Sequence, residues 1–141
     1  MKRLTLPWSR LGLVFLGGAL GTLLRVAILT TSKPRSSDGL LTNASWTGEV
    51  PWRLLVINSL GVLLAAYALA GPLRHPAKAD FRAFFLPGVL GGLTSYSALI
   101  LAERAIYLKC PGGAVATLVG ALLVAVFAAI LGYRLGRRTN T

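Results

Sequence analysis

The residues best suited to chemistry lie in one short stretch, residues 87–97, with the sequence PGVLGGLTSYS. Its proline removes a backbone donor and its glycines weaken a helix, so the stretch predicts an interrupted helix. It lies in an apolar segment long enough to cross a bilayer, where non-helical backbone is tolerated only inside protein or beside a polar cavity. An interruption frees carbonyl oxygens, and small hydroxyl groups stand beside them. This combination predicts a site for an ion, built inside the membrane.

Two further polar residues lie in apolar segments. Arg25 follows Gly17 and Gly21 at intervals of four residues, which places all three on one helical face. The two glycines predict a helix-packing face, and Arg25 either extends to the membrane interface or acts as an anchor that pairs with freed carbonyls or draws anions. Asn58 is the only amide in the second apolar segment. It either hydrogen-bonds a neighbouring helix or donates to a dehydrated anion.

The elements that must position these residues follow from hydropathy. The chain has 141 residues, of which 55% are hydrophobic and 13% charged, and its mean hydropathy is +0.68. Apolar segments cover about residues 11–31, 52–70, 83–102 and 114–135. Each is close to the roughly 20 residues that span a hydrocarbon core. We predict one all-α integral membrane domain over residues 1–141, with four transmembrane helices and a third helix broken at mid-membrane.

The net charge of +11 suggests a nucleic-acid partner at first, but the positions of the basic residues favour a membrane protein. With four spans, both termini and the middle connection share one side, which carries nine basic residues against five on the other. The nine are Lys2, Arg3, Arg10, Arg74, Lys78, Arg82, Arg134, Arg137 and Arg138. Cytoplasmic segments carry an excess of Lys and Arg, so we expect both termini in the cytoplasm and lipid, not nucleic acid, around the chain.

Catalytic residues are scarce. The chain has one histidine, one cysteine and four acids, and the acids lie outside the expected spans, at Asp38, Glu49, Asp80 and Glu103. His75 lies in a polar connection and Cys110 has no second cysteine to pair with. No nucleophile and base can be paired, and no metal-binding cluster is evident. The sequence therefore argues against an enzyme.

Three motifs together resemble those of the CrcB/Fluc family of fluoride channels. Residues 17–25, with the pattern GGxxGTxxR, are similar to its first-helix signature, and residues 56–61, VINxxG, to its second-helix asparagine motif. Residues 88–97, GVLGGLTSYS, resemble its most specific stretch, whose usual form is GFCGGLTTFSTF. The order, the spacing and the four expected spans fit over nearly the whole chain.

The resemblance implies an antiparallel, dual-topology dimer in the cell membrane, with two narrow pores that pass fluoride out of the cell. It also implies a central sodium ion, structural and not transported, held by the main-chain carbonyls of Gly91 and Thr94. The anion path would draw on Asn58, Tyr96, Ser97, Arg25 and, in the fourth helix, Thr117.

Several positions depart from the family pattern. Its two phenylalanines fall on Tyr96 and Leu99, and two of its threonines fall on Ala98 and Leu54. The positive ring edge of Tyr96 can still face an anion, whereas Leu99 has none. Ordinary drift is one explanation, and a heterodimer with an oppositely oriented paralogue is the one we favour over a homodimer.

Two other functions stay open from the sequence. One is a non-conducting accessory subunit of such a channel. The other is a small multidrug-type exporter, which also has four short helices but needs a carboxylate in the membrane, normally in the first helix. Residues 11–31 contain no acid.

Overall fold

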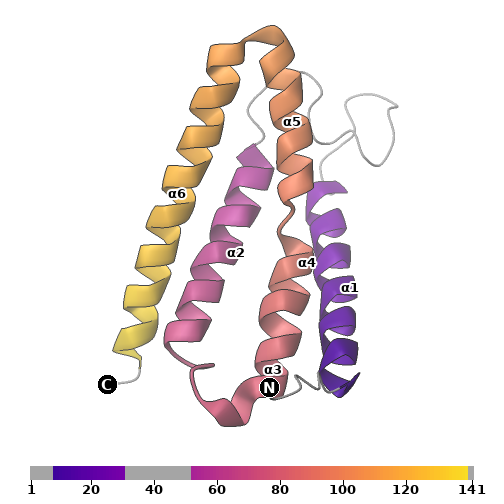
Figure 1. Ribbon diagram of the computed structural model, residues 1–141, viewed down its shortest axis with the longest axis vertical. Helices are drawn as coiled ribbons and strands as arrows, with labels where there is room; N and C mark the ends of the chain where they lie inside the picture. Colours follow the sequence, from indigo (N-terminus) through magenta and orange to yellow (C-terminus); the bar gives the residue numbers. More distant parts are fainter. Residues whose placement is uncertain (1–7, 31–51, 140–141) are drawn as a thin grey trace, which may run out of the picture.

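The computed structural model describes residues 8–30 and 52–139, and these form a bundle of long helices (Figure 1). Helix α1 covers Trp8–Thr30, α2 covers Trp52–Ala70 and α6 covers Pro111–Arg138. Between α2 and α6 runs a third segment, Ala79–Lys109, built from shorter pieces. All four are long and apolar enough to cross a membrane, which confirms the all-α membrane fold expected from hydropathy.

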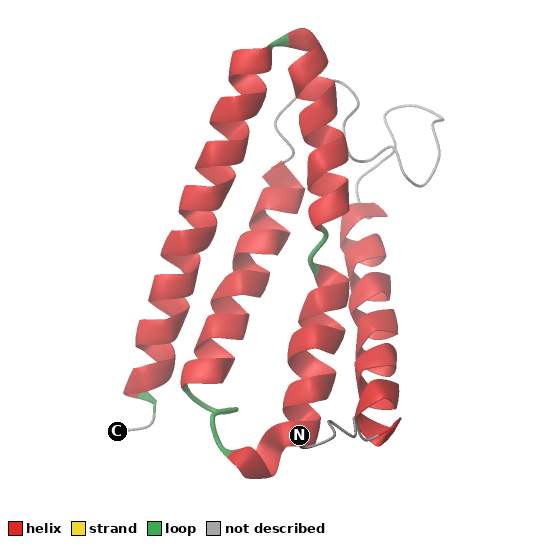
Figure 2. Cartoon of the chain, in the orientation of Figure 1, coloured by secondary structure: helices red, strands yellow, loops and turns green. Residues whose placement is uncertain are grey.

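The third segment is where the helix breaks, as the sequence predicts (Figure 2). A short 3-10 turn, η1, at Pro76–Lys78 leads into α3, Ala79–Ala83, and then into η2, Phe84–Leu90. Helix α4 is a single turn, Gly91–Leu93, and α5 covers Tyr96–Lys109. Between them the backbone is extended, with ψ of 141° at Thr94 and 105° at Ser95.

Proline explains the irregularity that precedes the break. Pro87 lies inside η2 and has no N–H to offer the carbonyl four residues before it. The turns of η2 are accordingly widened to the π form, and the Gly91 N–H is shared between the Gly88 carbonyl and the Leu86 carbonyl, five residues back. The third segment thus has a weakened ladder before it opens at Thr94.

Several helices extend beyond the spans expected from hydropathy. Helix α6 begins at Pro111, because a proline in the first turn loses no hydrogen bond there. Helix α5 continues to Lys109, past the expected end of the third span. Glu103, expected outside the spans, therefore lies within a membrane-length segment. The expected connection at residues 31–51 lies outside the described residues.

Glycines set how closely the helices pack. A Cβ on Gly17 would overlap the Phe84 carbonyl, and one on Gly21 the Val89 carbonyl, so α1 meets η2 backbone to backbone. The packing role expected for these two glycines is confirmed. Gly132 and Gly136 bring α6 equally close to α2. The break divides the third segment between two neighbours, since η2 and α4 pack on α1 while α5 packs on α6.

Candidate ion-binding site at the helix break

The carbonyls of Gly91 and Thr94 border the break. In a continuous α-helix they would accept the N–H groups of Ser95 and Ala98, four residues on. Instead, the Ser95 N–H donates to Oδ1 of Asn58 at 3.0 Å, and the Ala98 N–H donates to Oγ of Ser95 at 3.3 Å. Both N–H groups that would bond these carbonyls in a continuous helix thus donate to side chains. The two carbonyl oxygens are therefore left for another partner, and main-chain oxygens suit a hard cation.

The surroundings of these carbonyls are open. The Thr94 hydroxyl and N–H both donate to the Leu90 carbonyl at 2.9 Å, so this hydroxyl is engaged within its own helix. Gly91 is exposed and Thr94 is half-buried. A single chain thus does not fully cover the two residues that carry these oxygens.

Asn58 fixes the break from the neighbouring helix α2. Besides the bond from the Ser95 N–H, its Nδ2 lies 3.5 Å from the Ser95 carbonyl oxygen, so one amide side chain faces both polar groups of one residue. The interhelical hydrogen bond, one of two roles expected for Asn58, is confirmed. The other role, as an anion donor, stays a prediction.

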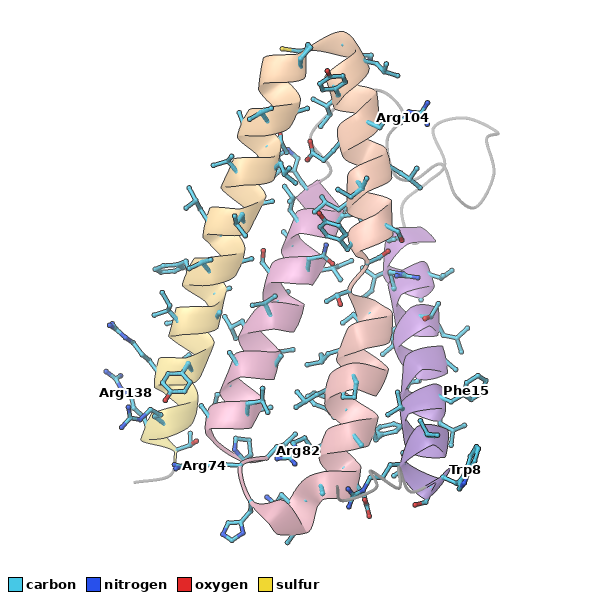
Figure 3. All side chains as sticks on the ribbon, viewed as in Figure 1. Trp8, Phe15, Arg74, Arg82, Arg104 and Arg138 are labelled. Atoms are coloured by element: carbon cyan, nitrogen blue, oxygen red, sulfur yellow. The ribbon has the colours of Figure 1, made fainter. Side chains whose placement is uncertain are left out.

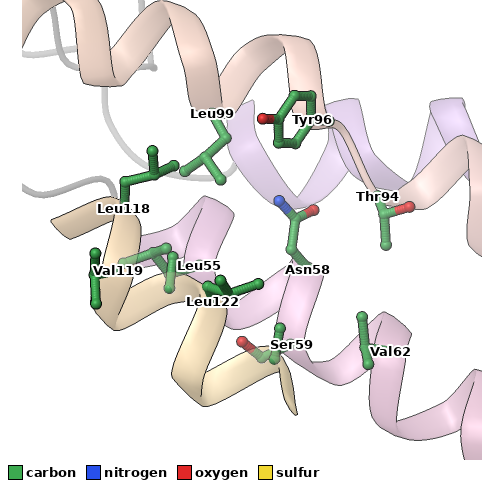
Figure 4. A pocket seen from close by; sticks show the side chains of 12 residues that line it. Leu55, Asn58, Ser59, Val62, Thr94, Tyr96, Leu99, Leu118, Val119 and Leu122 are labelled. Atoms are coloured by element: carbon green, nitrogen blue, oxygen red, sulfur yellow. The ribbon is translucent and has the colours of Figure 1, made fainter. Parts of the chain in front are cut away.

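A pocket of about 500 Å³ lies beside the break, between α2, α5 and α6 (Figure 4). Asn58 and Tyr96 form part of its wall, together with Leu99 and Leu122. The Asn58 amide nitrogen is on the side of Leu99, and its oxygen is on the side of Thr94. The wall is mostly apolar with few polar groups, and the first turn of α5 brings the positive end of a helix to it.

The other residues expected on an anion path lie further out. Thr117 lines a second pocket of about 620 Å³, and its hydroxyl donates to the Gly113 carbonyl at 2.9 Å. This pocket shares Leu55, Ser59 and Ala121 with the first. Ser97 is exposed, with its Oγ 3.3 Å from the Ser95 Oγ.

Arg25 stands apart from these groups. It is half-buried on α1 and is not among the residues that line either pocket. The structure thus gathers Asn58, Tyr96 and Thr94 at one pocket, with Thr117 at the adjoining one.

One of the departures from the family pattern lies in the wall of the same pocket. Leu99 is 6% exposed and contributes an aliphatic side chain to the wall. Leu54, one of the most buried residues of α2, is 3% exposed. Ala98 is half-buried on the first turn of α5. At Leu99 this chain therefore presents an aliphatic side chain to the pocket where the family motif has an aromatic ring.

Sequence reasoning missed two residues. Ser95 is buried and caps α5, and its position directly before an expected helix start could have identified it. Glu103 is 7% exposed on α5, and within the described part of the chain neither of its carboxylate oxygens has a hydrogen-bond partner. Its spacing of four residues from Leu99 places both on one helical face.

Charged side chains gather at the two ends of the bundle (Figure 3). Arg74, Arg82 and Arg138 lie at the end where α1 begins and α6 ends, while Arg104 lies toward the other. The Arg137 guanidinium is 5.9 Å from the centre of the Tyr133 ring. Long basic side chains and aromatic rings at helix ends are typical of a membrane interface.

Comparisons with known proteins agree with this architecture. The family described as CrcB-like protein, Camphor Resistance (CrcB), matches residues 12–133. The chain is 37% identical to a fluoride-specific ion channel FluC of Thermus thermophilus over 128 residues, covering 88% of this chain and 92% of the relative. It is 38% identical to FluC 2 of Corynebacterium jeikeium over 141 residues, covering 91% and 79%. FluC 1 of Cutibacterium acnes is 42% identical over 93 residues, covering 62% and 57%.

Proposed function

This chain belongs to the family of CrcB-like proteins, and we propose that it is a subunit of a fluoride-specific channel that lets fluoride leave the cytoplasm. Its relatives are named as ion channels, so it is not an enzyme. The observation that carries the proposal is the break in the third segment, where Asn58 and Tyr96 border one pocket. Helix α1 has no acid in its sequence, so the coupling group of a multidrug-type exporter is missing from it.

The pocket has features that suit a small, strongly hydrated anion. Fluoride must exchange its water for donors in a narrow passage, because no bulk water remains there. The amide nitrogen of Asn58 can donate, and the ring edge of Tyr96 carries partial positive charge. Thr117 in the adjoining pocket and Ser97 at the break extend the route, and Arg25 draws anions toward it. An apolar wall between these few groups raises the cost for any ion that they do not fit.

A structural sodium ion fits the carbonyls of Gly91 and Thr94. Their helical donors are taken by Asn58 and Ser95, which leaves oxygens of the kind that a hard cation binds. Because one chain supplies only two such groups, on residues that it does not fully cover, we propose that an oppositely oriented second chain supplies the other two. The bound ion would supply a fixed positive charge that holds the two breaks together.

The second chain is proposed to be a paralogue. Leu99 leaves this chain without the second aromatic edge, and the basic excess at one end favours one orientation in the cell membrane, with both termini in the cytoplasm. A partner of opposite orientation would then be a different chain. The aliphatic side chain of Leu99 in the pocket wall also favours a second candidate function, that of a subunit that does not itself conduct.

Efflux from liposomes tests the proposal. Liposomes that hold the purified chain and are loaded with fluoride are expected to release it down its gradient, as read with a fluoride electrode, while chloride stays inside. Tyr96→Ile is expected to slow this efflux at least tenfold. Tyr107→Ile is the matched control, since Tyr107 is an exposed aromatic on the same helix away from the pocket. Efflux only with the paralogue present would favour the heterodimer. Absence of efflux in both preparations would contradict a channel.

A further inference from the structure

The backbone N–H group of Ser95 is linked to both proposed ion sites. In a continuous helix the Ser95 N–H would bond the Gly91 carbonyl, and that oxygen would be lost to a cation. In the structure this N–H lies 3.0 Å from Oδ1 of Asn58. The same bond therefore does two things at once. It keeps the Gly91 carbonyl available, and it fixes the Asn58 amide with its oxygen pointing toward Ser95 at the break.

The orientation of the amide follows from that bond. Oδ1 can accept the Ser95 N–H only if the amide nitrogen stands on the other branch of the side chain. Figure 4 shows that nitrogen on the Leu99 side of the pocket, with the oxygen on the Thr94 side. The 3.5 Å contact from Nδ2 to the Ser95 carbonyl is long for a hydrogen bond and leaves donor capacity for a ligand.

Ser95 acts on the second carbonyl in the same way. Its Oγ accepts the Ala98 N–H at 3.3 Å, which is the donor that the Thr94 carbonyl would have in a continuous helix. Ser95 is 9% exposed, and its hydrogen bonds engage the two N–H groups that would otherwise bond the Gly91 and Thr94 carbonyls, namely its own and that of Ala98. It is not expected to touch either ion. It and Asn58 are the residues that hold the break open.

We infer that Asn58 and Ser95 are a positioning pair that couples the cation site to the anion pocket. The inference rests on the proposed function. In the broken state the Gly91 carbonyl is available and the Asn58 amide nitrogen keeps donor capacity at the pocket, whereas closing the helix between them would remove both features together. A cation and an anion that bind the same state favour each other, by thermodynamic linkage. Occupation of the cation site is then expected to favour anion binding at the pocket through the orientation of one amide.

Two substitutions at Asn58 separate the two effects. Asn58→Asp keeps an acceptor for the Ser95 N–H but has no amide donors. Asn58→Leu has a similar size and neither group. Sodium binding is measured as the dependence of the thermal midpoint on sodium, against N-methylglucamine, and fluoride passage as efflux from liposomes in the presence of the paralogue. Thr139→Val is the control, because it removes a hydroxyl bonded to the Gly136 carbonyl at the far end of α6.

The expected pattern is specific. Asn58→Asp keeps an apparent sodium affinity within about twofold of the original chain and loses at least tenfold in efflux. Asn58→Leu loses at least tenfold in both, and Ser95→Ala weakens sodium binding about fivefold, since a lost helix cap costs about 1 kcal/mol. Thr139→Val is expected to change neither the apparent sodium affinity nor the fluoride efflux. If Asn58→Leu does not fold, Ser95→Ala carries the test.

Failure of the coupling differs from failure of the proposed function. An original chain that shows neither sodium-dependent stability nor efflux, with or without the paralogue, would overturn both. An original chain that shows both responses, beside an Asn58→Leu or Ser95→Ala variant with unchanged sodium affinity, would overturn the coupling alone.

Discussion

The methyl group of Thr94 occupies the space that a side chain on Gly61 would need. The Thr94 side chain cannot easily turn away, because its hydroxyl donates to the Leu90 carbonyl at 2.9 Å. Helix α2 is therefore seated against the residue at which the third segment opens. This contact lies one turn along α2 from Asn58, which holds the other side of the break.

Gly61→Ala is expected to destabilise the chain by about 1–3 kcal/mol, as over-packing does in a filled contact. Thr94→Ser removes the methyl group and keeps the hydroxyl, so the double variant Gly61→Ala with Thr94→Ser should recover most of that loss. Denaturation of all four chains in detergent gives the coupling energy. Additive losses in the double variant would contradict the contact.

The close backbone contact of Gly17 and Gly21 on α1 with η2, called the glycine seam below, gives a second prediction. Gly21→Ala places a Cβ against the Val89 carbonyl, which is backbone and cannot move aside, so the chain should lose about 1–3 kcal/mol of stability. Gly18 is the control from the same helix, since a Cβ there meets no atom within 4 Å. Gly18→Ala is expected to be neutral or stabilising, because alanine is the better helix former. Equal thermal midpoints for the two variants would argue against this packing.

Gly91 should behave differently from the seam glycines. A Cβ there comes no closer to its own chain than 3.8 Å, at the Leu86 carbonyl oxygen, so one subunit has room for a side chain. Gly91→Leu is expected to fold with unchanged helical content but to lose dimers at least tenfold, because its side chain enters the space of the second chain and the cation. Gly112→Leu, in open space on α6, is the control for added bulk. Size-exclusion chromatography with light scattering distinguishes the two, and dimeric Gly91→Leu would contradict the proposed assembly.

How much of this could be predicted from the sequence differs between the fold and the site. Hydropathy located four spans, and Pro87 with the following glycines located the break, because both signals are local. The residues that hold the break open were harder to identify, since the bond from Ser95 to Asn58 joins residues 37 apart in the chain. Glu103 was missed for a related reason, because no local signal said that α5 continues past the apolar run to Lys109.

Restoring the family residues tests the aliphatic wall. Leu99→Phe with Ala98→Thr adds an aromatic edge and a hydroxyl. The pocket of about 500 Å³ beside the break, which Leu99 lines, has room for the ring. We expect fluoride efflux by this chain alone to rise at least tenfold. Leu118→Phe, on α6 in the wall of the same pocket, is the control for added volume. Rapid efflux through the unchanged homodimer would mean that the departures are only drift.

The single cysteine reports on orientation. Cys110 is exposed at the connection between α5 and α6, at the end opposite the start of α1. If both termini are cytoplasmic, a membrane-impermeant maleimide added to intact cells should label nearly all of the protein. A chain that inserts both ways would be labelled about half, with the rest reacting only after the cells are opened. Complete protection of Cys110 in intact cells would reverse the proposed orientation.

The glycine contacts that pack α1 and α6 against their neighbours affect which mutations such a protein can accumulate over time. Gly17 and Gly21 secure α1, and Gly132 and Gly136 secure α6, while the pocket wall is made by other side chains. A mutation of an aliphatic wall residue such as Leu99 therefore leaves these glycine contacts between helices unchanged. Once a gene of this kind is duplicated, each copy is free to lose a different half of the conducting machinery, as long as the two proteins still meet. Mutual dependence between paralogues can arise in this way without any gain in performance.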